Sequence, residues 1–254
     1  MAASNPTERF SSRVDNYLRY RPGYPTEVIN LLHNECGLTE DSRVADIAYG
    51  TGIFTRLLLE SGSRVFGVEP NAEMRRAGEE FLADYPRFTS LAGSAEATTL
   101  PEQSVDIVTA AQAAHWFDRE KARCEFQRIL EPGGWMVLLW NERRNGSTPF
   151  LEAYEQLLQT FGTDYGAVRH EHTTLAIDAF FSPLPFRTRT FAMRQEVDYP
   201  ALEGRLLSSS YTPQPGHAQY QAMLTELRRI FDAWQSQGRV ALEYDTRVFY
   251  GRPG

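Results

Sequence analysis

The chain has few cysteines, no long apolar run and no apolar leader. Cys36 and Cys124 are its only two cysteines, and two thiols in 254 residues do not describe a disulfide framework, so we expect both to be reduced. The most apolar stretch, 135–140, is far too short to cross a bilayer, and the polar start MAASNPTERF lacks the core of a signal peptide. We therefore expect a cytoplasmic protein that does not enter a membrane.

Basic residues are also in the minority. The 26 Lys and Arg against 33 Asp and Glu give a formal net charge of -7, whereas binding to a phosphate backbone needs a basic surplus. We therefore expect no nucleic-acid partner. We also expect no metal site, because His170 and His172 have no obvious third ligand. Because no internal repeat is present, the chain is predicted to form one domain. That domain is expected to consist of an amino-terminal lid and helix (1–40), a cofactor-binding half (41–145) and an acceptor-side half (146–254). We expect the protein to be a monomer or a homodimer.

Two nucleotide-binding signatures are missing. The dinucleotide fingerprint G-x-G-x-x-G needs a third glycine where Thr55 stands after Gly50 and Gly52. There is also no G-x-x-x-x-G-K-[ST] loop for a nucleoside triphosphate. These absences argue against a nicotinamide or flavin enzyme and against a triphosphatase.

What is present is an alternation of short apolar runs and helical patterns, which is typical of successive βα units and a parallel sheet. After Asn145 the pattern changes and ends in two further strands, which predict an antiparallel hairpin at the sheet edge. The prediction is a Rossmann-like, doubly wound α/β fold with a seven-stranded, mostly parallel sheet. The expected strands are 43–48, 63–69, 87–93, 104–111, 135–140, 186–199 and 239–251, and the expected helices are 52–61, 72–85, 118–130, 149–161, 202–210 and 217–235, with irregular chain between 161 and 186.

The strongest local feature is the sequence VADIAYGTG, in which a buried strand ends at Asp46 and turns through Gly50 and Gly52 into a helix. Glycines allow a tight turn with no side chain between backbone and ligand. Glu69 ends the next strand, where a carboxylate can accept hydrogen bonds from ribose hydroxyls. The alternative for Glu69 is a carboxylate that interacts with the start of the helix after Asn71.

In these and further motifs, the sequence resembles the class I S-adenosylmethionine-dependent methyltransferases, and within them the small-molecule, type 11 branch that includes trans-aconitate methyltransferase-like proteins. The resemblance covers most of the chain. It rests on YRPGYP, DIAYGTGIFTRLL, GVEPNAEMRRA, GSAEATTLPEQSVDIV, AQAAHWFD and RILEPGGWMVLLWN, in the order expected of that family.

The resemblance implies S-adenosylmethionine as cofactor and S-adenosylhomocysteine as product. It places the 46–52 turn around the methionine part, Glu69 at the ribose and Met74 at the adenine. The other implied cofactor residues are Tyr20, Arg21, Asp46, Ala48, Gly50, Gly52, Pro70, Ser94, Ala95, Glu96, Gln112, Ala113 and His115.

The expected reaction is methyl transfer to a small molecule, a carboxylate being one candidate acceptor. A hydroxyl or amine acceptor would benefit from a base, for which His115 is the first candidate, and Asn141 could direct polar atoms into the pocket. For His115, Trp116 and Asn141, the alternative is an ordinary packing role. The residues expected at the acceptor are Tyr17, Tyr24, Trp116, Trp140, Asn141 and Tyr211, with 17–25 as a lid.

Two rival functions stay open. Many relatives have glycine where Ala48 stands, and the bulky Tyr49 beside it could reshape the methionine end of the pocket. Such a pocket could support cyclisation of the cofactor with release of methylthioadenosine instead of methyl transfer. The other rival is a non-catalytic cofactor-binding protein that keeps the fold.

Overall fold

A computed structural model describes residues 20–163, 165, 173–209 and 211–253. The predicted lid therefore lies only partly inside the described residues, and Tyr17 lies outside them. Within the described part, no helix has the length and apolar character that a membrane span requires.

The sheet has seven strands in the order β3-β2-β1-β4-β5-β7-β6, with β1 to β5 parallel and β7 antiparallel to both of its neighbours. This confirms the predicted mostly parallel sheet with an antiparallel carboxyl-terminal hairpin. The order reverses between β1 and β4, and ligands of doubly wound sheets bind at that point, beyond the carboxyl ends of the strands. The strands are β1 (Arg43–Ile47), β2 (Arg64–Val68), β3 (Phe88–Leu91), β4 (Val105–Ala111), β5 (Leu130–Arg143), β6 (Phe186–Val197) and β7 (Val240–Gly251).

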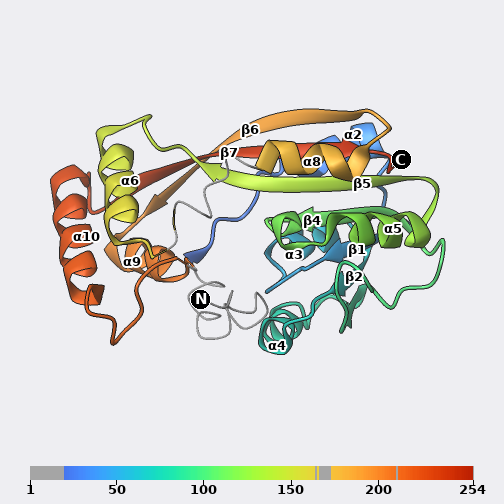
Figure 1. The fold of residues 1–254 in the computed structure, drawn as a ribbon, viewed down its shortest axis with the longest axis horizontal. Helices are drawn as coiled ribbons and strands as arrows, with labels where there is room; N and C mark the ends of the chain where they lie inside the picture. Colours follow the sequence, from blue (N-terminus) through green and yellow to red (C-terminus); the bar gives the residue numbers. More distant parts are fainter. Residues whose placement is uncertain (1–19, 164, 166–172, 210, 254) are drawn as a thin grey trace.

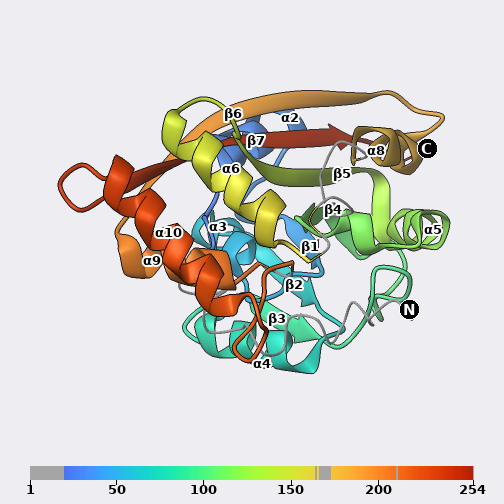
Figure 2. The same ribbon diagram turned by 60° about the vertical axis from the view of Figure 1, so that its left-hand side comes forward.

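Helices cover both faces of the sheet, and a third group packs beyond the ends of β5 and β7 (Figures 1 and 2). α5 and α8 cover one face, and α2 and α3 cover the other. α6, α9 and α10 form a separate apolar core with the ends of β6 and β7. The helices are α2 (Glu27–Cys36), α3 (Ile53–Glu60), α4 (Ala72–Phe81), the 3-10 helix η3 (Ala114–Trp116), α5 (Arg119–Ile129), α6 (Pro149–Phe161), α8 (Thr173–Phe181), α9 (Tyr199–Leu207) and α10 (Tyr220–Trp234).

Some predicted boundaries are wrong for identifiable reasons. β5 begins at Leu130 and not at Trp135, because the register against β4 shifts there and the strand takes up the Pro-Gly-Gly segment as a bulge. α9 begins at Tyr199, since the Asp198 carboxylate caps it by accepting from the Ala201 N–H at 2.9 Å. The chain predicted to be irregular between 161 and 186 contains α8.

Trp140 is a correction to the predicted acceptor residues. Side chains alternate between faces along β5, and Trp140 points to the face covered by α8, where it is 1% exposed and packs edge-on against Phe249 at 5.9 Å between ring centroids. It belongs to the apolar core. Asn141 and Arg143 lie on the opposite face of the strand.

Candidate active site

The turn after β1 is built from residues in the left-handed backbone region. Ala48, Gly50 and Gly52 have φ of 54°, 61° and 86°. A Cβ at Gly52 would lie 2.7 Å from the Leu82 side chain, so this glycine allows α3 to begin close to the end of α4. Gly52 lines neither of the pockets described below, whereas Ala48 and Gly50 line both.

Ala48 is strained, because an L-residue with a Cβ pays a penalty in this region that glycine does not. We expect Ala48→Gly to raise the free energy of unfolding by about 0.5–1 kcal/mol, the strain relief being partly offset by the greater freedom of glycine in the unfolded chain. Urea denaturation of the wild type and the variant measures this difference in the free energy of unfolding. The same change at Ala77, inside helix α4, is the matched control and should destabilise by about 1 kcal/mol. Equal losses in both variants would contradict the strain argument.

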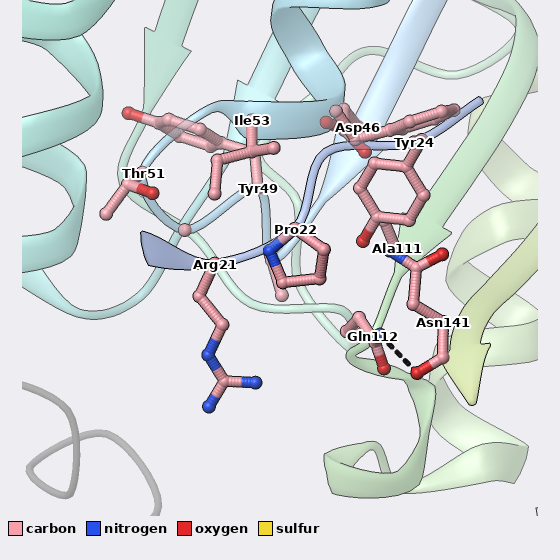
Figure 3. A pocket seen from close by; sticks show the side chains of 13 residues that line it. Arg21, Pro22, Tyr24, Asp46, Tyr49, Thr51, Ile53, Ala111, Gln112 and Asn141 are labelled. Carbon is pink, nitrogen blue, oxygen red and sulfur yellow. Dashed lines mark hydrogen bonds between the residues drawn. The ribbon is translucent and has the colours of Figure 1, made fainter. Parts of the chain in front are cut away.

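The Tyr49 side chain turns away from the methionine end of the site. Its ring lies against Gly67 and Gly78, where an added Cβ would come within 2.7 Å and 2.5 Å of it. Its hydroxyl donates to the Arg75 carbonyl at 3.1 Å and hydrogen-bonds Ser90 Oγ at 3.0 Å. Figure 3 shows the ring extending away from Tyr24. The expectation that the bulk of Tyr49 reshapes the pocket is therefore wrong.

Asp46 is a buried carboxylate at the end of β1. The Thr55 hydroxyl donates to its Oδ2 at 2.6 Å, and the Thr109 hydroxyl donates to its Oδ1 at 2.8 Å. Burial raises the pKa of Asp46 to about 6 despite these two hydrogen bonds. Because burial has removed the water that would stabilise the ionised carboxylate, a cation placed beside Asp46 would interact with it strongly.

Glu69 is oriented by the backbone around it. Its Oε2 accepts from the Gly50 N–H at 3.0 Å, and its Oε1 accepts from the Asn71 N–H at 2.8 Å. Burial raises its pKa, while these two N–H groups and Arg75 oppose the shift. These contacts stabilise the turn before α4. Each carboxylate oxygen keeps a second lone pair that could accept from a ligand hydroxyl, and the ribose-binding role of Glu69 stays a prediction.

Two adjoining pockets meet at the turn. The first, here called the Glu69 pocket, encloses about 980 Å³ including its open mouth, and the second, here called the Asp46 pocket, encloses about 500 Å³ on the same measure (Figure 3). Ala48, Gly50, Ala111 and Gln112 line both. Predicted residues in the Glu69 pocket are Ala48, Gly50, Glu69, Pro70, Met74, Ser94, Ala95, Glu96, Gln112, Ala113 and Trp116; those in the Asp46 pocket are Arg21, Tyr24, Asp46, Ala48, Gly50, Gln112 and Asn141.

Five other predicted residues are described but line neither pocket, and His115, treated below, is one of them. Tyr20 packs on Gly204 of α9, where an added Cβ would lie 2.1 Å from its ring. Tyr211 packs on Tyr165, with 4.9 Å between ring centroids. Gly52 and Trp140 serve packing, as described above. Of the candidate acceptor residues, the described part of the structure therefore brings Tyr24, Trp116 and Asn141 to the pockets.

Asn141 ties the amino-terminal segment to the sheet. Its Nδ2 donates to the Gly23 carbonyl at 2.8 Å, and its Oδ1 accepts from the Thr246 hydroxyl at 2.6 Å. Its own carbonyl accepts from Gln112 Nε2 at 3.2 Å, the dashed contact in Figure 3. With these groups engaged, Asn141 acts as a positioning residue that holds the segment before α2 over the Asp46 pocket.

His115 lies on η3 with its side chain exposed, and its ring is 4.7 Å from that of Trp116. Trp116 and Phe117 line the Glu69 pocket, whereas His115 does not. The catalytic role of His115 stays a prediction.

Sequence reasoning missed several lining residues. Thr51 stands between the two glycines, so the motif itself could have revealed it, and Asn71 is recognisable as the cap of α4, accepting from the N–H groups of Glu73 and Met74. Ile53 and Phe54 at the start of α3 look like ordinary core residues in the sequence. The missed residues are Pro22, Thr51, Ile53, Phe54, Asn71, Ala111 and Phe117; Tyr49, which the sequence did single out, also lines the Asp46 pocket.

These residues fit an adenosyl cofactor with a charged amino-acid end. The Thr51 hydroxyl is buried at the Asp46 pocket with no hydrogen-bond partner among the described residues, which is costly unless a ligand supplies one. The Glu69 pocket combines a carboxylate for a diol with the apolar Met74, Ala95 and Phe117 for a flat ring.

Comparisons with known proteins agree with this geometry. Residues 45–138 match the methyltransferase domain family. An uncharacterized methyltransferase of Mycobacterium tuberculosis is 41% identical over 190 residues, covering 75% of this chain and 69% of the relative. An uncharacterized methyltransferase of Schizosaccharomyces pombe is 32% identical over 151 residues, and the match spans only 59% of its length.

Solved structures show the same fold. A protein of Anaeromyxobacter dehalogenans, provisionally assigned as a type II methyltransferase, aligns with 92% of this chain and 98% of its own at a TM-score of 0.67 and 22% identity. Haemonchus contortus phosphoethanolamine N-methyltransferase 2 was solved with S-adenosylhomocysteine. It aligns with 96% of this chain and 58% of its own at a TM-score of 0.53 and a sequence identity of 16%. The relative that is 41% identical and the matching family model place the chain in the methyltransferase domain family, and the solved structures show that it has their fold.

Proposed function

We propose that this enzyme transfers a methyl group from S-adenosylmethionine to a small-molecule acceptor and leaves S-adenosylhomocysteine. The observation that carries the proposal is the pair of adjoining pockets at the 48–50 turn, because one can hold a nucleoside while the other presents a buried carboxylate. When bound, S-adenosylmethionine supplies an electrophilic methyl group on a sulfonium sulfur.

The residues divide between the two pockets by their chemistry. Glu69 would bind the ribose hydroxyls, and Met74 and Ala95 would contact the adenine. Asp46 and Thr51 would hold the amino-acid end, where a positive ammonium group favours the ionised form of Asp46.

The remaining task of the protein is alignment and exclusion of water, which is what a displacement reaction at carbon mainly needs. Tyr24 packs against Phe54 with ring centroids 5.1 Å apart, and Asn141 holds the Gly23 carbonyl, so residues 21–24 close one side of the Asp46 pocket. An acceptor entering beside this segment would be shielded from solvent.

Incubation with methyl-labelled S-adenosylmethionine and a metabolite panel, read by mass spectrometry, tests the proposal. Methyl transfer leaves S-adenosylhomocysteine, cyclisation leaves methylthioadenosine, and a purely binding protein leaves the cofactor intact. We expect S-adenosylhomocysteine together with a methylated acceptor. Methylthioadenosine as the main product would replace the proposal with cyclisation, and a lack of cofactor binding in calorimetry would reject both.

A further inference from the structure

A group of buried and half-buried cationic and phenolic side chains lies beyond the Asp46 pocket and lines neither pocket. It consists of Arg143 at the end of β5, Arg205 on α9 and Tyr244 on β7, with Tyr154 and Glu155 of α6 beside them. Three donors in this group are buried with no hydrogen-bond partner in the described part of the chain: Nη1 of Arg143, Nη1 of Arg205 and the Tyr244 hydroxyl.

Only one of the two terminal nitrogens of the Arg143 guanidinium, Nη2, has hydrogen-bond partners among the described residues. Its Nη2 donates to Glu155 Oε2 at 2.6 Å, the Tyr165 hydroxyl donates to the same oxygen at 2.6 Å, and the guanidinium carbon lies 4.9 Å from the centre of the Tyr154 ring. The Arg143 side chain is 13% exposed. Burial lowers its pKa, but Tyr154, Tyr165 and Glu155 outweigh burial, so Arg143 stays charged with its Nη1 unused.

Arg205 and Tyr244 form the other half of the group. The Arg205 guanidinium lies 5.5 Å from the centre of the Tyr244 ring, and no described carboxylate forms an ion pair with it. Tyr244 is 0% exposed. The described members thus comprise two guanidiniums and one carboxylate, Glu155, and that carboxylate already accepts from Arg143, Tyr165 and Gln159.

The group adjoins the Asp46 pocket through the sheet and through α9. In the antiparallel register Asn141 pairs with Thr246 and Arg143 pairs with Tyr244, so the two pairs are successive on one face of β5 and β7. Asn141 lines the Asp46 pocket. From the other side, Arg21 of the pocket donates through Nη2 to the Ser208 carbonyl at 3.1 Å, just beyond α9.

We propose that Arg143, Arg205 and Tyr244 bind an anionic oxygen group of the methyl acceptor, a carboxylate or a phosphate. Buried donors without acceptors are costly, and three in one place match the several lone pairs of such an anion. Because a planar guanidinium and a phenol are preorganised donors, the anion gains charge-assisted hydrogen bonds there. This inference rests on the proposed methyltransferase function, whose acceptor class it specifies.

The test is calorimetric titration of the full-length protein saturated with S-adenosylhomocysteine. The probes are succinate, fumarate, benzoate and inorganic phosphate, with succinamide, fumaramide and benzamide as neutral counterparts. We expect at least one anion to bind at least tenfold more tightly than the amides do, and the better anion type distinguishes a carboxylate acceptor from a phosphate acceptor. Uniform binding of anions and amides would overturn the inference.

Variants separate this role from a structural one. Tyr244→Phe removes a hydroxyl without a described partner, so we expect an unchanged or raised Tm together with a loss of anion affinity of about tenfold. Arg205→Gln should lower the affinity for the anion by about tenfold or more. Tyr250→Phe, six residues further along β7, and Arg194→Gln, on the exposed face of β6, are the matched controls and should bind the anion as the wild type does.

The two proposals fail in different ways. Loss of S-adenosylhomocysteine binding in the wild type would reject the methyltransferase proposal itself. Normal cofactor binding with equal anion affinity in Tyr244→Phe, Arg205→Gln and the controls would reject the anion site alone.

Discussion

Replacing Glu69 with alanine is expected to weaken S-adenosylmethionine binding by about 100-fold or more, because the variant would lose the hydrogen bonds that we propose between this buried carboxylate and the ribose. A second effect adds to this one. The Gly50 and Asn71 N–H groups lose their acceptor, so the turn that separates the two pockets loosens. Isothermal titration calorimetry of the folded variant measures the affinity, with circular dichroism to verify the fold.

Two further substitutions sharpen this result. Glu69→Gln keeps one side-chain oxygen and should give an intermediate loss. Glu73→Ala is the control, because it removes an exposed carboxylate from the first turn of α4 and so also weakens the interaction with the helix dipole. Glu73 lines neither pocket, so this variant should bind the cofactor as the wild type does. If Glu69→Ala bound the cofactor within threefold of the Glu73→Ala control, Glu69 would be only a stabiliser of the helix start.

Cofactor affinity is expected to fall as the pH drops below about 6, because protonation of Asp46 would remove the charge that we propose to face the amino-acid end of the ligand. With a pKa of about 6, an order-of-magnitude loss is expected at pH 5, and the affinity should be level above pH 7. Calorimetry between pH 5 and pH 8 measures the profile. Asp46→Asn should bind weakly at every pH and lack this slope; a slope that persists in the variant would assign the titration to another group.

The same shift predicts how stability depends on pH. Burial raises the pKa of Asp46 from its ordinary value of 3.8 to about 6, so the folded state binds the proton more tightly than the unfolded state does. The contribution of Asp46 to stability is therefore greatest below pH 4, decreases as the pH rises from 4 to 6, and is constant above that, a span of about 3 kcal/mol. The difference in unfolding free energy between wild type and Asp46→Asn, followed from pH 4 to pH 7, isolates this term.

The βα alternation and the turn motif could be predicted because their causes are local. Apolar runs of strand length, the glycines at 50 and 52 and the carboxylates at 46 and 69 belong to short segments whose geometry follows from backbone sterics and periodicity. The pockets at the end of β1 follow from these local rules together with the position where strand order reverses.

The misplaced residues depend on contacts between distant segments. Trp140 was expected at the acceptor because it ends the predicted apolar strand 135–140. The alternation along β5 turns it towards α8, while its neighbour Asn141 faces Gly23 and Thr246. Tyr49 looked bulky in a narrow turn, yet Gly67 and Gly78, from different elements, leave the space its ring occupies.

The amino-acid order alone determined the fold class, the parallel strands, the glycine turn and the two acidic residues beside it, since each depends on neighbours in the chain. Only the tertiary structure decided which polar side chains meet. Arg143, Arg205 and Tyr244 come from two strands and a helix that are far apart in the sequence, and the pairing of β5 with β7 and the packing of α9 bring them together. Burial then removes the water that would otherwise satisfy their donors, which is why their importance is visible only in the folded chain.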